Sequence, residues 1–223
     1  MIVPAPIVDS LKPLQQFVFD GLTWDQYEAL LASLGERRLR HTFVEGRLEV
    51  VTPSYEHESS KSFVGGLVEM MCRLCRLPRQ SAGSTTMKRE DFERGLEPDE
   101  CFFLGKESAA AMRGKSQYYA DVDPPPDLVI EVDVTSNSKH RIEMYRRMGV
   151  PEVWRCRNYI VTFLGLTKDG RYRQLQRSRH FSFLSSDDLN RFIELRDALN
   201  DTELELQFEA WVREQIKSKK ERS

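Results

Sequence analysis

Apolar residues recur at helical spacing in two stretches of the N-terminal half of the chain. The first stretch follows Thr23, which would cap a helix in a capping box with Gln26, and it ends at Gly35. The second begins after Pro53-Ser54 and predicts a longer helix over residues 55–76. The apolar positions are Trp24, Tyr27, Leu30, Leu31 and Leu34 in the first helix, and Phe63, Leu67, Met70, Met71 and Leu74 in the second. Each helix therefore has one face suited to packing against a core.

Runs of β-branched, aromatic and aliphatic residues predict strands. HTFVE and RLEVV flank Glu45-Gly46 and predict a β-hairpin, whereas residues 127–134, DLVIEVDV, are apolar enough for a central strand. Further strands are expected over residues 79–90 and at CFFL, VPEVWRC, YIVTFLGL and RYRQLQ, with a hairpin turn at Asp169-Gly170. Helices are expected from residues 135–138 to Met148, after Ser185-Ser186-Asp187, and over LELQFEAWVREQI.

This order of strands and helices predicts an α/β fold. Residues 21–216 are expected to form a single domain, with a polar, irregular connection at 105–123. An extended arm, residues 1–20, precedes it with three prolines, and a basic tail, residues 217–223, follows it. No internal repeat and no linker divides the chain.

Composition and charge narrow the function classes. The chain is 40% hydrophobic and 30% charged, as is usual for a globular protein. Its net charge is −2, so the overall charge does not attract nucleic acid. No apolar run approaches the roughly 20 residues of a membrane span, and the N-terminus lacks the features of a secretory signal. We therefore expect a cytoplasmic protein. The four cysteines are scattered and complete no zinc motif.

Acidic residues in strand segments give the candidate chemistry. Glu131 lies within the apolar strand at 127–134, where an unpaired carboxylate would carry a severe desolvation cost. Asp127 and Asp133 share its face because side chains alternate along a strand. Asp99 follows Pro98 at the start of another strand. Carboxylates gathered in this way suit Mg²⁺ or Mn²⁺, so we expect Asp99, Glu131 and Asp133 to bind a metal ion. An architectural alternative is that Glu131 pairs with Arg141 or Lys88, or lies at a solvated end of the sheet.

Several strings of the sequence resemble the Uma-type family of putative restriction endonucleases. They are EHESS, GSTTMKRE, GLEPDECFFL, PPPDLVIEVDVTSNSKHRIEMY and RRMGVPEVWRC. The resemblance runs from about Thr23 to Trp211. It implies a PD-(D/E)xK nuclease-like fold: a restriction-endonuclease-like mixed central sheet flanked by helices, with an extra N-terminal hairpin and C-terminal helices. It also implies that Asp99 and Glu131 are the metal-binding acids and that Glu58, after His57, completes the site.

The chain departs from the family pattern at one position. The pattern has lysine two residues after Glu131, where this chain has Asp133. In the family the basic residue often lies on the following helix, one turn before a tyrosine, and the matching residues here are Arg141 and Tyr145. An arginine stabilises phosphate charge but cannot act as a general base. Lys88 and Lys139 are the alternative basic residues.

Other motifs are incomplete or absent. His57-Glu58 lacks the second histidine of a zinc protease motif, so His57 either contacts substrate or a metal-bound water, or caps a helix. No serine-hydrolase elbow or nucleotide-binding glycine loop is present.

The sequence therefore predicts a Mg²⁺-dependent endonuclease that acts on DNA. A homodimer is one expectation for its assembly, because many nucleases that cut both strands are dimers. The alternative is a relative that kept the fold without catalysis and binds DNA or protein.

Overall fold

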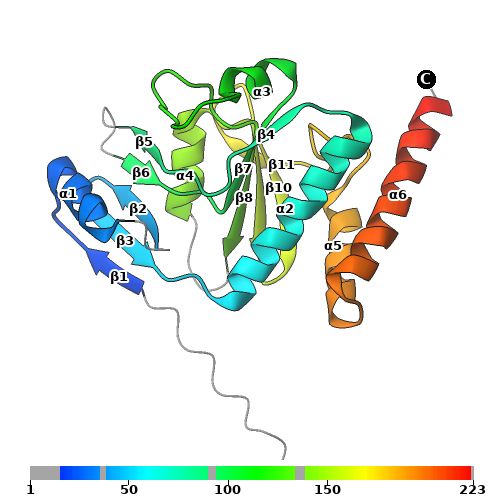
Figure 1. Cartoon of the computed structure of the whole chain (residues 1–223), viewed down its shortest axis with the longest axis horizontal. Coiled ribbons are helices and arrows are strands. Elements are labelled where there is room, and N and C mark those ends of the chain that lie inside the picture. The colour runs from blue at the N-terminus through cyan, green and yellow to red at the C-terminus, as the bar shows by residue number, and fades with distance from the viewer. Residues whose placement is uncertain (1–15, 36–38, 90–93, 134–138, 222–223) are drawn as a thin grey trace, which may run out of the picture.

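Two β-sheets with helices packed around them make up the computed structural model, which describes residues 16–35, 39–89, 94–133 and 139–221 (Figure 1). The larger sheet has the strand order β11-β10-β9-β8-β7-β4. Its strands are β4 (Arg79–Ser81), β7 (Glu100–Leu104), β8 (Leu128–Asp133), β9 (Glu152–Arg157), β10 (Ile160–Leu166) and β11 (Tyr172–Gln174). The strands β8 and β9 are parallel and the other pairs are antiparallel, so the sheet is mixed. This confirms the predicted α/β class.

The central strand of the larger sheet is β8. Every residue from Leu128 to Asp133 is buried, because helices cover both faces of the strand. One face carries Leu128, Ile130 and Val132 and packs against α2 (Tyr55–Cys75). The other face carries Val129 and Glu131 and lies toward α4 (Lys139–Met148). Glu131 therefore projects into a protein-covered face of the sheet.

The smaller sheet has the order β1-β3-β2-β6-β5 and lies at the end of the molecule remote from α6 (Figure 1). Its strands are β1 (Gln16–Phe19), β2 (Arg40–Val44), β3 (Arg47–Val51), β5 (Met87–Arg89) and β6 (Arg94–Leu96). The hairpin β2–β3 turns at Glu45 and Gly46, which both have positive φ, as the sequence predicts. One face of this sheet packs against α1 (Trp24–Leu34), where Tyr27 stacks on Phe43.

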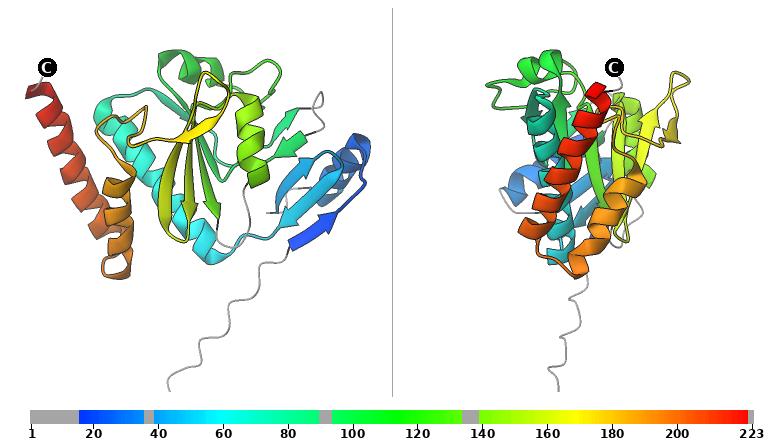
Figure 2. Two further views of the ribbon diagram at one scale, coloured as in Figure 1. Left: turned by 180° about the vertical axis from the view of Figure 1, so that it is seen from behind. Right: turned by 90° about the vertical axis from the view of Figure 1, so that its right-hand side faces the viewer.

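The remaining helices are α3 (Lys106–Met112), α5 (Ser186–Glu194), the 3₁₀ turn η2 (Leu195–Asp197) and α6 (Asp201–Glu221). Helices α5 and α6 lie on the α2 side of the larger sheet, where α5 packs against β10 and α6 packs against α2 (Figures 1 and 2). Among the residues that the structure covers, no helix combines the length and apolarity needed to cross a bilayer.

Several elements differ from the sequence predictions. Residues 79–90 form two short strands in different sheets, since β4 pairs with β7 and β5 pairs with β6. Residues 16–19, placed in the extended arm, form β1 against β3, and residues 1–15 lie outside the described part. The irregular connection contains α3, whose sequence KESAAAM is rich in alanine. Helix α6 continues through residues 217–221, which were expected to belong to the basic tail. The predicted N-terminal hairpin, β2–β3, is not isolated but belongs to the five-stranded sheet.

Candidate active site

Asp99 and Glu131 lie beside each other because β7 and β8 are paired. The register joins Glu100 to Ile130, and Asp99 precedes Glu100 just as Glu131 follows Ile130. Asp99 Oδ2 accepts a hydrogen bond of 2.6 Å from the backbone N–H of Val132. Both carboxylates are 1% exposed, so each needs close partners to compensate for lost hydration.

Glu131 is held by two side chains from α4. Arg141 donates to it twice, with Nε 2.8 Å from Oε2 and Nη2 2.9 Å from Oε1, and the hydroxyl of Tyr145 donates to Oε1. Arg141 and Tyr145 are four residues apart on the helix, so they share one face. Burial and the Glu131 carboxylate both raise the pKa of Tyr145 well above its usual value. The pairing of Glu131 with Arg141, considered from the sequence as an alternative, is thus present.

Arg141 also ties the two sheets together. Its Nη1 donates to the hydroxyl of Thr42 in β2 at 2.7 Å, and its Nη2 donates to the backbone carbonyl of Glu97. Burial disfavours the charged guanidinium, but Glu131, Tyr145 and Asp99 together outweigh that effect, and the pKa of Arg141 rises well above its usual value. All the nitrogen atoms of this guanidinium are therefore engaged by protein groups.

Arg40, the first residue of β2, is a member of the site that the sequence did not reveal. Its Nη2 lies 2.5 Å from Asp99 Oδ1 and 3.6 Å from Glu131 Oε2. The only local signal is that Arg40 and Thr42 alternate with His41 and Phe43 along a strand, which places them on the face away from α1. The sequence does not say what lies opposite that face, because the contact joins residues of two separate sheets.

His57 joins the cluster from the first turn of α2. Its backbone N–H is capped by Ser54 at 3.1 Å, which fixes the ring at the helix start. Its Nε2 lies 2.8 Å from Nη1 of Arg40 and 3.1 Å from Asp99 Oδ1. Since a guanidinium only donates, Nε2 accepts from Arg40 in the neutral ring, and Nδ1 carries the proton toward Glu58 at 3.1 Å. Glu58, expected to complete the site, therefore reaches it through His57.

Two other predicted residues are directed elsewhere. Asp133 shares the Glu131 face as expected, but it pairs with Arg155 of β9 at 2.8 Å. Within the described ranges, no three His, Cys, Asp or Glu side chains form a metal-binding group, so the three-acid site is not formed. Lys88 lies opposite Gly95 on the α1 face of the smaller sheet, where it pairs with Glu28 at 2.8 Å. It is thus on the wrong face to reach Glu131. The side chain of Lys139 lies outside the described part.

The charges around the acid pair balance. Two carboxylates, Asp99 and Glu131, face two guanidinium groups, Arg40 and Arg141. Burial alone raises the pKa of Asp99, but the positive charges of Arg40 and Arg141, together with the neighbouring His57, reverse the direction and bring it to about 2. Asp99 is therefore ionised at neutral pH.

The donors at this place fit a small divalent cation if Arg40 moves aside. Asp99 Oδ1 is a buried atom with no hydrogen bond of good geometry, and it points at the Arg40 guanidinium that also faces Glu131. The two acids thus already share a positive group between them. Mg²⁺ commonly binds through one or two carboxylates and completes its shell with water and substrate phosphate, so two acids suffice.

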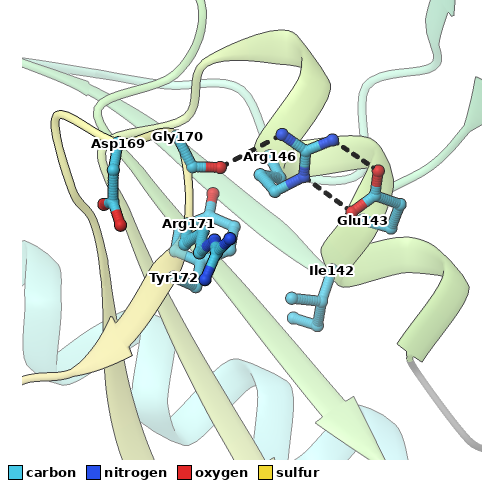
Figure 3. A pocket seen from close by; sticks show the side chains of 7 residues that line it. All are labelled: Ile142, Glu143, Arg146, Asp169, Gly170, Arg171 and Tyr172. Carbon is cyan, nitrogen blue, oxygen red and sulfur yellow. Dashed lines mark hydrogen bonds and ion pairs between the residues drawn. The ribbon is translucent and has the colours of Figure 1, made fainter.

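A separate hollow of about 470 Å³ lies between α4 and the β10–β11 hairpin (Figure 3). Within it, Arg146 donates to Glu143 and to the carbonyl of Gly170, so its charge is already compensated. None of the acids predicted to bind metal lines this hollow. The candidate metal-binding acids are therefore confined to the Asp99–Glu131 cluster.

Comparison with solved structures defines the class of fold. The chain is similar to the crystal structure of a putative nuclease belonging to DUF820 from Anabaena variabilis, with a TM-score of 0.54 and 16% sequence identity over 77% of this chain and 99% of that chain. At this identity the likeness shows the fold alone, and it confirms the predicted nuclease-like architecture.

The family follows from the sequence itself. The family model Uma2, described as "Putative restriction endonuclease", matches residues 24–200, so the chain belongs to that family. This confirms the resemblance stated above. No curated protein matches the chain.

Proposed function

We propose that this protein is a nuclease that hydrolyses phosphodiester bonds in DNA with a divalent cation, Mg²⁺ or Mn²⁺. The observation that carries the proposal is that the buried acids Asp99 and Glu131 both face the guanidinium of Arg40, in a chain of the Uma2 family. Two acids that already hold a positive group between them are suited to hold a metal ion in its place.

Asp99 and Glu131 would hold the cation, which would polarise a phosphoryl oxygen and lower the pKa of an attacking water. The Val132 N–H fixes Asp99, and Arg141 with Tyr145 fixes Glu131. Such supporting hydrogen bonds orient ligands and are commonly needed for full activity. Because the donors of Arg141 are on Glu131, Thr42 and Glu97, we assign Arg141 to positioning Glu131 and not to contacting the phosphate.

His57 is the described residue best suited to accept a proton. Arginine cannot be deprotonated, whereas the Nε2 atom of His57 is an acceptor that lies 3.1 Å from Asp99. Glu58 at Nδ1 holds the tautomer and would stabilise the ring once it is charged. This arrangement of a base with an orienting carboxylate would replace the missing lysine of the family pattern.

Purified full-length protein incubated with plasmid, linear duplex and single-stranded DNA tests this function. We expect cleavage of at least one substrate with Mg²⁺ or Mn²⁺ and none with EDTA. Intact DNA under all metal conditions would contradict the proposal.

A second candidate is a non-catalytic protein that binds DNA or another protein. The neutralised acid pair favours it, because Arg40 and Arg141 satisfy both carboxylates without a metal ion. In that case the same samples would retard DNA in a gel at low salt without cutting it, and EDTA would change nothing.

A further inference from the structure

We propose that Arg40 is an internal cation that occupies the place of the divalent metal ion, and that metal binding requires its guanidinium to leave the acid pair. The inference rests on the proposed function, since it concerns the same site. It adds a competition between a side chain and the metal ion, with Arg40 as a positioning residue.

The position of Arg40 is the first observation. Its Nη2 lies within ion-pair distance of both acids, at 2.5 Å from Asp99 and 3.6 Å from Glu131. The Asp99 oxygen that it faces is the buried oxygen without a well-formed hydrogen bond. A metal ion bound by both acids needs this oxygen and this space, so the two cations exclude each other.

The difference between the two arginines is the second observation. Arg141 has hydrogen bonds from Nε, Nη1 and Nη2 to three different residues. Arg40 has a buried Nε with no hydrogen-bond partner, and its Nη1 donates to His57. An unsatisfied buried donor costs free energy, so Arg40 is the guanidinium that leaves at lower cost. It also has a path, because its side chain is 16% exposed.

The charge balance of the cluster also indicates that one arginine must leave when a metal ion binds. The cluster is neutral with both arginines in place, and adding a divalent cation would leave two uncompensated positive charges in a buried site. Withdrawal of Arg40 lowers this excess to one, which a phosphate monoanion from the substrate backbone would neutralise. The released guanidinium can then pair with a neighbouring phosphate of the same strand, because its fork matches phosphate oxygens. Arg40 thereby links metal entry to substrate binding.

Titration calorimetry with Mn²⁺ alone, without DNA, tests the competition on the full-length protein. We expect Arg40→Gln to bind Mn²⁺ at least about tenfold more tightly than wild type, because a unit positive charge next to the metal position is removed. Arg155→Gln is the matched control, since Arg155 pairs with a buried acid of the same strand, Asp133, outside the acid pair. We expect its Mn²⁺ affinity to equal that of wild type.

The outcomes separate this inference from the proposed function. Equal binding by wild type and Arg40→Gln, lost in Asp99→Asn, would overturn the role of Arg40 and leave the metal site in place. Weaker binding by Arg40→Gln would also overturn it. Absence of Mn²⁺ binding in every protein would remove both the metal site and the competition.

A second measurement needs no substitution in the site. In ¹⁵N spectra of arginine side chains of the wild-type protein, we expect Mg²⁺ to move the Arg40 Nε–H signal and to speed its exchange with water. The Arg155 signal should stay unchanged. An Arg40 signal that is unaffected by saturating Mg²⁺ would overturn the inference even if Arg40→Gln does not fold.

Discussion

Glu131 shows how a carboxylate is accommodated inside an apolar strand. It is 1% exposed, and its oxygens receive hydrogen bonds from Arg141 and Tyr145. The sequence predicts that such a residue must be compensated, because an unpaired buried charge is costly. It does not predict the second guanidinium, Arg40, because that residue arrives from another sheet.

Replacement of Arg141 by lysine tests how much the contacts of this arginine contribute to the stability of the fold. An ammonium group cannot reproduce the paired hydrogen bonds to Glu131 and the bonds to Thr42 and Glu97 together. We expect Arg141→Lys to lower the free energy of unfolding by about 3 kcal/mol, measured by urea denaturation. Arg147→Lys is the control, since Arg147 pairs with the partly exposed Glu143 on the same helix, and we expect a change below about 0.5 kcal/mol. Equal effects of the two substitutions would contradict this account of the site.

Asp99 predicts a dependence of stability on pH. Its pKa in the folded protein, about 2, is below the usual value of 3.8, so its contribution is fully present above pH 4 and is lost as the pH falls toward 2. The contribution amounts to about 2 kcal/mol. We expect wild type to lose about 1.5 kcal/mol more stability than Asp99→Asn between pH 4.5 and pH 2.5, because pH 2.5 is still above the folded pKa and part of the contribution remains. Urea denaturation at both pH values measures the difference. Parallel pH profiles of the two proteins would contradict the assignment.

Local sequence signals predict several individual elements well. Capping boxes begin α1 at Thr23 and α5 at Ser185, and Ser54 caps α2. The turns at Glu45-Gly46 and Asp169-Gly170 are also where the sequence places them. These features depend on neighbouring residues only. The division of residues 79–90 into β4 and β5 was missed because the partners of a strand are distant in the sequence.

Gly95 in β6 is required by a contact between a strand and a helix. A Cβ atom at this position would lie 2.8 Å from Cζ of Tyr27, closer than real Cβ contacts, and Tyr27 is held by its hydroxyl on His41 at 2.9 Å. We expect Gly95→Ala to lower the melting temperature through a loss of about 2 kcal/mol.

Gly66 in α2 serves as the comparison for Gly95. A Cβ atom there would meet only Glu205 Oε1 at 3.7 Å, so the substitution has space. We expect Gly66→Ala to stabilise the protein by about 0.5–1 kcal/mol, because alanine is the better helix former. A stabilising Gly95→Ala or a strongly destabilising Gly66→Ala in the same thermal scans would contradict the packing described here.

At the scale of the whole molecule, buried thiols lie on both faces of the larger sheet. Cys72 and Cys156 lie in the core on the α2 side and Cys101 on the α4 side, whereas Cys75 is exposed. Burial raises the pKa of Cys72 to about 12 and that of Cys156 to about 11, which further suppresses their thiolates. We expect Ellman's reagent to modify one thiol of the native protein and four after denaturation. Rapid native modification of a second thiol would show that one face of the sheet opens.

The fold as a whole was more predictable than the site. Periodicity predicts the α/β class and the buried strand β8, and the motif strings indicate the family that matches residues 24–200. The site depends on which face of which sheet each side chain meets. Lys88 and Arg40 illustrate this, since the smaller sheet turns Lys88 toward α1 and Arg40 toward Asp99.

The central claim is that Asp99 and Glu131 bind the metal ion of a nuclease. The most direct measurement is the rate of Mg²⁺-dependent hydrolysis of a substrate DNA by wild type and by Asp99→Asn, with the fold of each protein verified by circular dichroism. The account predicts that Asp99→Asn reduces the rate by at least about a hundredfold, because both metal binding and the orientation of the site are lost. An equally active Asp99→Asn protein would contradict it.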